Sequence, residues 1–124
     1  MPKMFLSIAG TLAALAALLG AFGAHGLKAK LAPEMMAVYQ TAVQYHMWHA
    51  LGLAIIALAL PQWPHLTLLR WAAWLMVLGV VLFSGSLYAL ALTEIKMLGA
   101  ITPFGGLAFI IAWIMFAAAM WKSK

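Results

Sequence analysis

Four long uncharged runs dominate the pattern of hydrophobic and polar positions along the chain. They cover residues 4–27, 35–69, 71–93 and 97–121, and Pro61 and Pro64 divide the second. About 20 predominantly apolar residues suffice for a helix to cross the ~30 Å hydrocarbon core of a bilayer, and a proline ends a helix near the residue before it. The pattern therefore predicts four transmembrane helices, near residues 4–25, 34–60, 67–92 and 98–121.

The connections between these predicted helices are short. Helices that follow one another through short connections lie side by side and run antiparallel. We therefore expect an all-α integral membrane protein, a four-helix transmembrane bundle with up-down-up-down topology. A single transmembrane domain over residues 1–124 accounts for the whole length.

Composition supports this fold class and limits the partners. Hydrophobic residues make up 68% of the chain and charged residues 7%, whereas soluble domains are about half apolar and a quarter charged. Seven Lys and Arg outnumber two acids, and they lie at the ends of the apolar runs, where anionic lipid headgroups attract them. Membrane lipid, and not nucleic acid, is therefore the expected partner of these cations. The absence of cysteine excludes disulfides, iron–sulfur clusters and thiolate metal sites.

Lysine and arginine positions also predict the orientation. With four spans, both termini lie on one side of the membrane with the loop after the second helix, and that side carries Lys3, Arg70, Lys122 and Lys124. The other side carries Lys28, Lys30 and Lys96. Because cytoplasmic loops carry the excess of Lys and Arg, both termini are predicted to be cytoplasmic.

The second predicted helix differs from the others because residues 39–52 carry many polar and aromatic side chains. With 100° of rotation per residue, Gln44, Tyr45 and His49 fall on one face of this helix. An unpaired polar group is costly in hydrocarbon, so these three side chains are predicted to face the interior of the bundle.

The rest of the same helix is predicted to meet lipid. Met47 and Leu58 are assigned to the lipid-facing side of this helix. His46 lies about 60° beyond His49, at 100° per residue, and is therefore expected on the rim of the polar face.

Polar residues of the neighbouring helices are predicted to complete a cluster with this face. Ser84 lies halfway along the third helix, one turn from Tyr88, and antiparallel packing brings it to the depth of His49. His25 ends the first helix where the second begins, so it is expected to close the cluster towards the interface. The candidate site residues, with His49 and Gln44 at the centre, are His25, Gln44, Tyr45, His49, Ser84 and Tyr88.

Four sequence motifs carry a family resemblance. They are residues 20–26 (GAFGAHG), Gln44-Tyr45 with His49, residues 82–88 (LFSGSLY) and residues 102–106 (TPFGG). In this order they resemble the YgdD/YwdK-like family of small four-helix membrane proteins, a family of unknown function. The resemblance implies a bacterial cytoplasmic membrane, with relatives in mitochondria. It implies no activity and no catalytic residue.

Several functions are compatible with this polar face, and the one that we favour is a non-catalytic structural or accessory membrane component. In it the polar groups hydrogen-bond one another between helices and set their register. A homo-oligomer or a larger membrane complex would provide the setting. No cofactor is expected. An enzyme is disfavoured because a pair of Ser84 and His49 would lack the acid that orients the base.

Two alternatives stay open. An oligomer could transport a small molecule or an ion along the polar face of the second helix, since four helices leave little room for a pore in a monomer. A metal or haem site would draw on His25, His46 and His49, because His46 and His49 have helical i,i+3 spacing. No carboxylate or thiol lies near these histidines in the sequence.

Overall fold

A computed structural model describes residues 1–123 of the chain, and these residues form four long helical spans. The first span is α1 (Pro2–Phe22) continued by a π-helical turn, Gly23–Leu27, and the second is α2 (Pro33–Ala59). The third joins α3 (Thr67–Gly79), a π-helical turn (Val80–Ser84) and α4 (Gly85–Thr93). The fourth joins a 3₁₀ turn (Lys96–Ala100) to α5 (Thr102–Lys122).

Each of the four spans is long and apolar enough to cross a membrane. Their bounds, Pro2–Leu27, Pro33–Ala59, Thr67–Thr93 and Lys96–Lys122, lie within two residues of those predicted from the charge pattern. The predicted all-α four-helix fold is confirmed.

Proline and one unusual backbone angle mark the ends of the helices. Pro2, Pro33 and Pro103 lie in the first turns of α1, α2 and α5, where the missing backbone N–H would have no helical partner in any case. The third span ends at Glu94, whose φ of 58° places it in the left-handed region. A residue in this conformation commonly closes a helix C-terminus.

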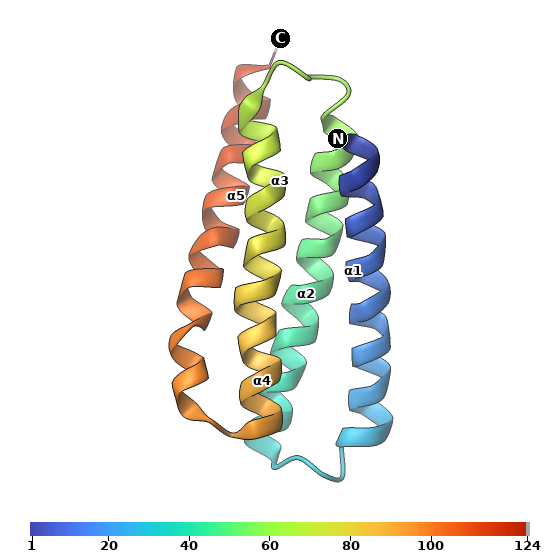
Figure 1. The fold of residues 1–124 in the computed structure, drawn as a ribbon, viewed down its shortest axis with the longest axis vertical. Helices are drawn as coiled ribbons and strands as arrows, with labels where there is room; N and C mark the ends of the chain where they lie inside the picture. Colours follow the sequence, from blue (N-terminus) through green and yellow to red (C-terminus); the bar gives the residue numbers. More distant parts are fainter. Residues whose placement is uncertain (124) are drawn as a thin grey trace.

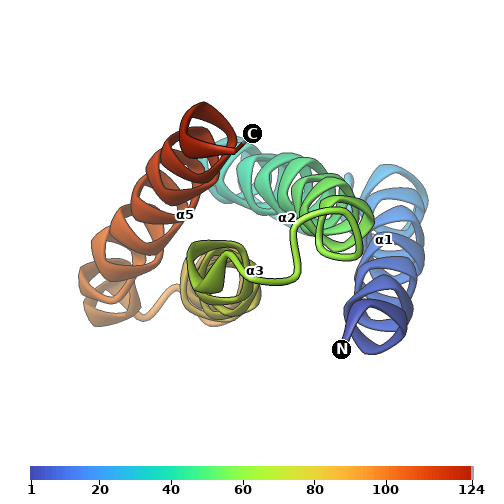
Figure 2. The same cartoon turned by 90° about the horizontal axis from the view of Figure 1, so that it is seen from above.

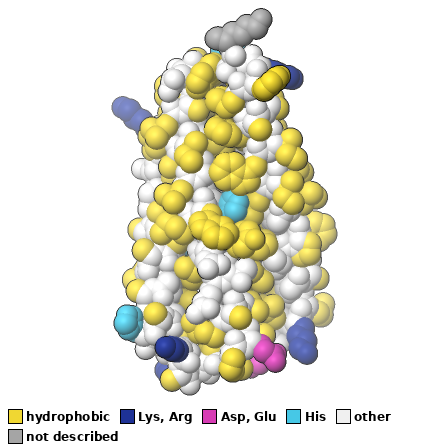
Figure 3. Space-filling model, turned by 180° about the vertical axis from the view of Figure 1, so that it is seen from behind, with side chains coloured by type: hydrophobic (Ala, Val, Ile, Leu, Met, Phe, Trp, Pro, Cys, Tyr) yellow, Lys and Arg dark blue, Asp and Glu magenta, His cyan; other side chains and the backbone are white. Residues whose placement is uncertain are grey.

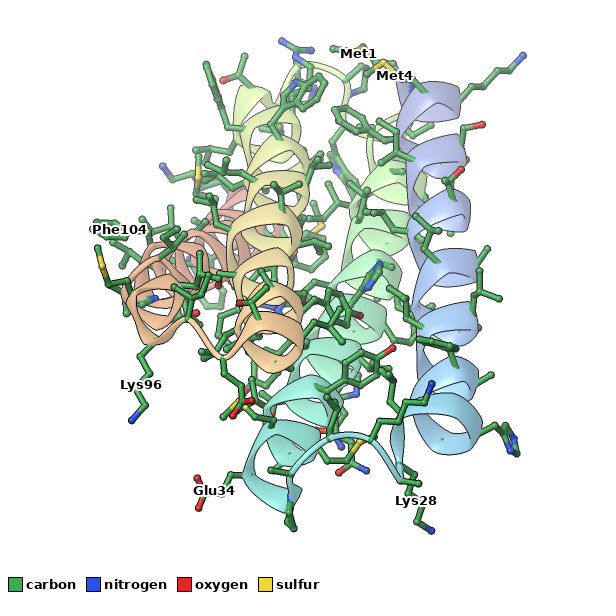
Figure 4. The ribbon with its side chains drawn as sticks, turned by 60° about the horizontal axis from the view of Figure 1, so that its bottom comes forward. Met1, Met4, Lys28, Glu34, Lys96 and Phe104 are labelled. Atoms are coloured by element: carbon green, nitrogen blue, oxygen red, sulfur yellow. The ribbon has the colours of Figure 1, made fainter. Side chains whose placement is uncertain are left out.

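The helices run alternately up and down (Figure 1). Seen from above, α1, α2 and α5 form a curved row, and α3 lies on its concave side (Figure 2). Close backbone contacts join α1 to α2, α2 to the third span, and α5 to α3 and its π-helical turn. Lys28, Glu34 and Lys96 lie at the end of the bundle opposite Met1, as alternating helices require (Figure 4).

The core is largely apolar, and so is most of the outer surface. The largest fully buried side chains of the core include Phe5, Leu53, Ile56, Leu69 and Met76. Seen from behind, hydrophobic side chains cover the body of the molecule, and charged ones lie only near its two ends (Figure 3). A soluble protein rarely shows so large an apolar surface, whereas a hydrocarbon environment favours one.

Glycines permit the closest contacts between α5 and the third span. A Cβ built at Gly105 would lie 2.3 Å from the backbone nitrogen of Phe83, in the π-helical turn. A Cβ built at Gly79 would lie 2.3 Å from the ring of Phe109. The backbone of α5 therefore rests directly on the π-helical turn, and Phe109 fills the space over Gly79.

The inward face of α2 differs from the predicted one. Buried side chains include Tyr39, Ala42, His46, His49, Leu53 and Ile56. Exposed ones are Gln40, Gln44, Trp48, Leu51, Ile55 and Leu58. At 100° per residue, the inward face is rotated by about one residue position from the prediction.

This rotation accounts for which individual residues of α2 are buried and which are exposed. His49 is buried and Leu58 is exposed, as predicted. The inward position of Gln44 and the rim position of His46 were wrong, since Gln44 is exposed and His46 is 4% exposed. Met47, predicted to face lipid, is half-buried.

Candidate functional site

His46 and Tyr88 form the central polar pair of the bundle. The Nδ1 atom of His46 in α2 lies 2.8 Å from the hydroxyl of Tyr88 in α4. Either group can donate, depending on the tautomer of the imidazole. The ring of Tyr39 packs edge-on against Tyr88, with centroids 5.4 Å apart. The pair thus joins the second span to the third at the level of the bundle core.

The other ring nitrogen of His46, Nε2, is buried and has no hydrogen-bond partner among the described residues. The backbone of Leu12 in α1 lies beside this ring. His46 is therefore enclosed by three spans, and it uses one of its two nitrogens.

Tyr39 joins α2 to α1. Its hydroxyl donates to the backbone carbonyl of Leu19, and its ring lies over Gly23. A Cβ at Gly23 would lie within 2.4 Å of that ring. Gly23 therefore leaves the room that lets Tyr39 reach the carbonyl of Leu19.

His49 faces α5 rather than the His46–Tyr88 pair. Its Nδ1 donates to the backbone carbonyl of Tyr45, one turn earlier, over 2.8 Å. Its ring stacks on Phe109 with centroids 3.5 Å apart and an angle of 11° between the planes. Trp113 borders the same ring at 5.9 Å. His49 is thus part of an aromatic layer between α2 and α5, to which Tyr45 also belongs.

Two serines of the third span complete the connections between helices. Ser84, fully buried in the π-helical turn, donates to the backbone carbonyl of Ala42 in α2 over 2.8 Å. Ser86 shares a 2.6 Å hydrogen bond with Thr102 at the start of α5. A π-helical turn shifts the phase of the residues around it, and here the turn itself packs against both α2 and α5.

The structure separates the six residues predicted to form one cluster. Tyr88 and Ser84 do contact α2, but through His46 and Ala42 rather than His49. Gln44 is exposed on the outside of α2 and His25 at the end of the first span, so neither joins the cluster. The predicted centre at His49 and Gln44 was wrong because the inward face of α2 is rotated.

The predicted cluster left out four residues that the structure uses to join helices. Tyr39 and His46 are seven positions apart and therefore share a helical face, and this spacing was a usable signal. Ser86 and Thr102 give no such signal, since nothing local indicates that the third and fourth motifs pair through them.

A three-histidine metal site is not assembled in the part of the chain that the structure describes. Within residues 1–123, no three His, Cys, Asp or Glu side chains are close enough to hold a metal ion. His46 and His49 face different neighbours, Tyr88 and Phe109, and His25 is exposed. The geometry therefore does not bring together His25, His46 and His49.

Comparison with known proteins places the chain in a family. The family described as "Protein of unknown function (DUF423)" matches residues 19–106. The UPF0382 membrane protein YwdK of Bacillus subtilis (strain 168) is 51% identical over 120 residues, which cover 97% of this chain and 98% of YwdK. The UPF0382 membrane proteins of Staphylococcus haemolyticus and Staphylococcus aureus (strain bovine RF122 / ET3-1) are 48% and 43% identical, each over 97% of both chains.

No solved structure matches the chain. Neither the family description nor the names of these relatives state a molecular activity. The relatives are nevertheless called membrane proteins, in agreement with the four apolar spans. The matches extend over nearly the whole chain and include the four motifs of the resemblance, so the chain belongs to the YwdK-like membrane protein family of unknown function, DUF423.

Proposed function

We propose that this protein is a non-catalytic membrane component that acts through helix–helix contacts within the bilayer. The observation that carries the proposal is the division of polar side chains on α2. Those that face inward bond to groups of the same chain, whereas Gln40 and Gln44 face outward. The hydrogen bonds of the described residues include neither of these two amides.

The inward side chains form hydrogen bonds between the helices of the bundle. Tyr39 ties α2 to α1, His46 ties α2 to α4, and Ser84 ties the π-helical turn to α2. Such bonds between membrane helices contribute about 0.6 kcal/mol each on average. Together with the close glycine contacts, they give the bundle a defined register.

The same geometry argues against hydrolytic chemistry in the bundle. The Oγ–H of Ser84 donates to the Ala42 carbonyl, and Nδ1 of His49 donates to the Tyr45 carbonyl. An activated serine must instead hydrogen-bond to its base, and the base must bond to an orienting group. Ser84 and His49 are each engaged with backbone, so they do not form such a pair.

The outward amide groups find no hydrogen-bond partner in the lipid around them. Gln44 is two residues from the middle of α2 (Pro33–Ala59), about 3 Å along the axis, so it faces the hydrocarbon core. Acyl chains offer an amide no hydrogen-bond partner. A polar group of another membrane-embedded chain would satisfy it.

Site-specific photo-crosslinking in membranes tests this proposal. A photoreactive amino acid at position 51 lies on the exposed face of α2, and the same amino acid at position 18 of α1 is the matched control. We expect protein adducts from position 51 and lipid adducts from position 18. Lipid adducts from both positions would refute a role in helix–helix contact.

A second candidate is transport through an oligomer. Gln40 and Gln44 line up one helical turn apart on the exposed face, as residues lining a path between subunits would. Solute flux in proteoliposomes, compared between wild type and Gln40→Leu/Gln44→Leu, separates the two functions. Flux that disappears in the double variant would favour transport.

The proposal includes a location and an orientation. The family and the apolar surface support a membrane protein, and we place it in the bacterial cytoplasmic membrane with both termini in the cytoplasm. The excess of Lys and Arg on the terminal side supports this orientation. Reporter fusions should place both termini inside, and a periplasmic signal from both would reverse the orientation.

A further inference from the structure

We infer that a second copy of this chain occupies the outer face of α2, with Gln44 pairing with its own counterpart. The inference rests on the proposed role in helix–helix contact and names the partner. Three properties of this face support a second copy: its helical spacing, the depth of its polar group, and its self-complementary chemistry.

The exposed residues of α2 follow the spacing of a helix–helix seam. Gln44, Trp48, Leu51, Ile55 and Leu58 are separated by four, three, four and three residues, and all five are exposed in the single chain. This alternation repeats every seven residues, as the a and d positions of a left-handed helix pair do. The residues fall within an arc of about 80° at 100° per residue. We call them the α2 ridge.

The α2 ridge is open along its length. Its side chains are exposed, whereas α3 lies on the concave side of the row formed by α1, α2 and α5 (Figure 2). The convex side carries hydrophobic side chains over most of its height (Figure 3). A second helix can therefore approach α2 from this side.

The depth of Gln44 selects a protein partner over a phospholipid. The polar ester groups of lipids lie at the edge of the ~30 Å hydrocarbon core, roughly 15 Å from its middle, whereas Gln44 is about 3 Å from the middle of α2. A partner must bring a polar group to the same depth. Two copies with the same orientation do so automatically, because a two-fold axis along the membrane normal places equal residues at equal depth.

The chemistry of glutamine also suits a symmetric contact. A side-chain amide carries both a donor and an acceptor, so two Gln44 side chains satisfy each other without a second residue type. The groove beside them, about 420 Å³, has Gly20 and Ala24 of the first span on one wall and Gln40 and Gln44 on the other. The small residues let a partner side chain enter next to the amides.

Disulfide trapping in membranes tests the contact directly. The chain contains no cysteine, so any disulfide reports only an introduced position. Leu51→Cys and Leu58→Cys place thiols on the α2 ridge, 52% and 60% exposed in the single chain. The controls, Leu18→Cys in α1 and Ile110→Cys in α5, are 65% and 58% exposed. A disulfide requires Cα atoms within about 7 Å, so oxidation should yield dimers from the two ridge variants and monomers from the controls.

Self-association of the purified full-length protein in lipid vesicles then tests the role of the amide. Gln44→Leu should raise the dimer Kd about five- to thirtyfold, the equivalent of ~1–2 kcal/mol for a hydrogen bond between membrane helices. The matched control is Thr41→Val, because the Thr41 hydroxyl already bonds to the Ala37 carbonyl of its own helix. Thr41→Val should leave the Kd within twofold of wild type.

The outcomes distinguish a failure of this inference from a failure of the proposed function. A monomer in vesicles, or equal trapping at ridge and control positions, would overturn the two-fold contact. A monomer that retains a bound phospholipid, lost in Gln44→Leu by native mass spectrometry, would assign the groove to lipid and overturn it too. Protein photo-adducts from position 51 to another chain would then still support helix–helix contact as the function.

Discussion

Gly105→Ala should separate α5 from the third span, because the added methyl group meets backbone rather than a flexible side chain. A Cβ at this position lies 2.3 Å from the nitrogen of Phe83 and 2.7 Å from its Cα. Ordinary contacts begin at 3.4 Å, so α5 must move by roughly 1 Å. A change of side-chain rotamer cannot make this room, because the two nearest atoms belong to the backbone.

The neighbouring glycine provides the matched control. A Cβ at Gly106 would lie 3.7 Å from the ring of Phe83, an ordinary contact. Both glycines have negative φ, so alanine suits the backbone at either position. The preference of helices for alanine over glycine, up to about 1 kcal/mol, therefore acts on both variants and cancels in their difference. Overpacking typically costs about 1–3 kcal/mol, and we expect this difference between Gly105→Ala and Gly106→Ala.

Unfolding in mixed detergent micelles measures this difference, and the six tryptophans of the chain report it by fluorescence. Gly106→Ala should unfold at or above the denaturant concentration of wild type, and Gly105→Ala clearly below it. Equal free energies of unfolding for the two variants would refute the direct packing of α5 on the π-helical turn.

Three further substitutions test other contacts by the same assay. Tyr88→Phe removes the partner of the His46 Nδ1 and should lower the free energy of unfolding by about 0.6 kcal/mol, the average for hydrogen bonds between membrane helices, and by at most about 1.7 kcal/mol; an unchanged value would mean that the pair does not stabilise the bundle. Gly23→Ala pushes against the ring of Tyr39 and should cost about 1–3 kcal/mol, and an unchanged free energy of unfolding would refute the close contact of this ring with Gly23. Glu94→Gly relieves a left-handed backbone conformation and should stabilise the protein by up to about 1 kcal/mol, and a loss of stability would refute the strain.

The four spans were predictable because the signal for them is strong. A membrane-spanning helix must exclude charge over about 20 residues. The chain places its charges only at the ends of such runs, and Pro61 and Pro64 divide the longest one. The predicted bounds consequently lie within two residues of the observed ones. The antiparallel order followed from the short connections alone.

The rotation of α2 was not predictable from the polar pattern. In a soluble helix, hydrophobicity marks the buried face, but lipid and protein core are equally apolar, so this contrast disappears in a membrane. The assumption that every polar residue turns inward placed Gln44 inside and His46 on the rim. Both of these positions were wrong, since Gln44 is exposed and His46 is buried.

The sequence pattern also could not predict which polar residues pair with one another. The π-helical turn at Val80–Ser84 changes the phase of the third span, and no residue type announces such a turn. Ser84 and Tyr88 were correctly identified as contacting α2, but their partners depend on that phase.

The most direct test of the account measures unfolding and self-association side by side for an inward and an outward variant. Tyr88→Phe should lower the free energy of unfolding and leave the dimer Kd in vesicles within twofold of wild type. Gln44→Leu should do the reverse, raising the Kd about five- to thirtyfold while the free energy of unfolding of the monomer stays unchanged. A Gln44→Leu variant that unfolds more easily and associates as wild type does would contradict the division of α2 into an inward face that holds the bundle and an outward face that binds a partner.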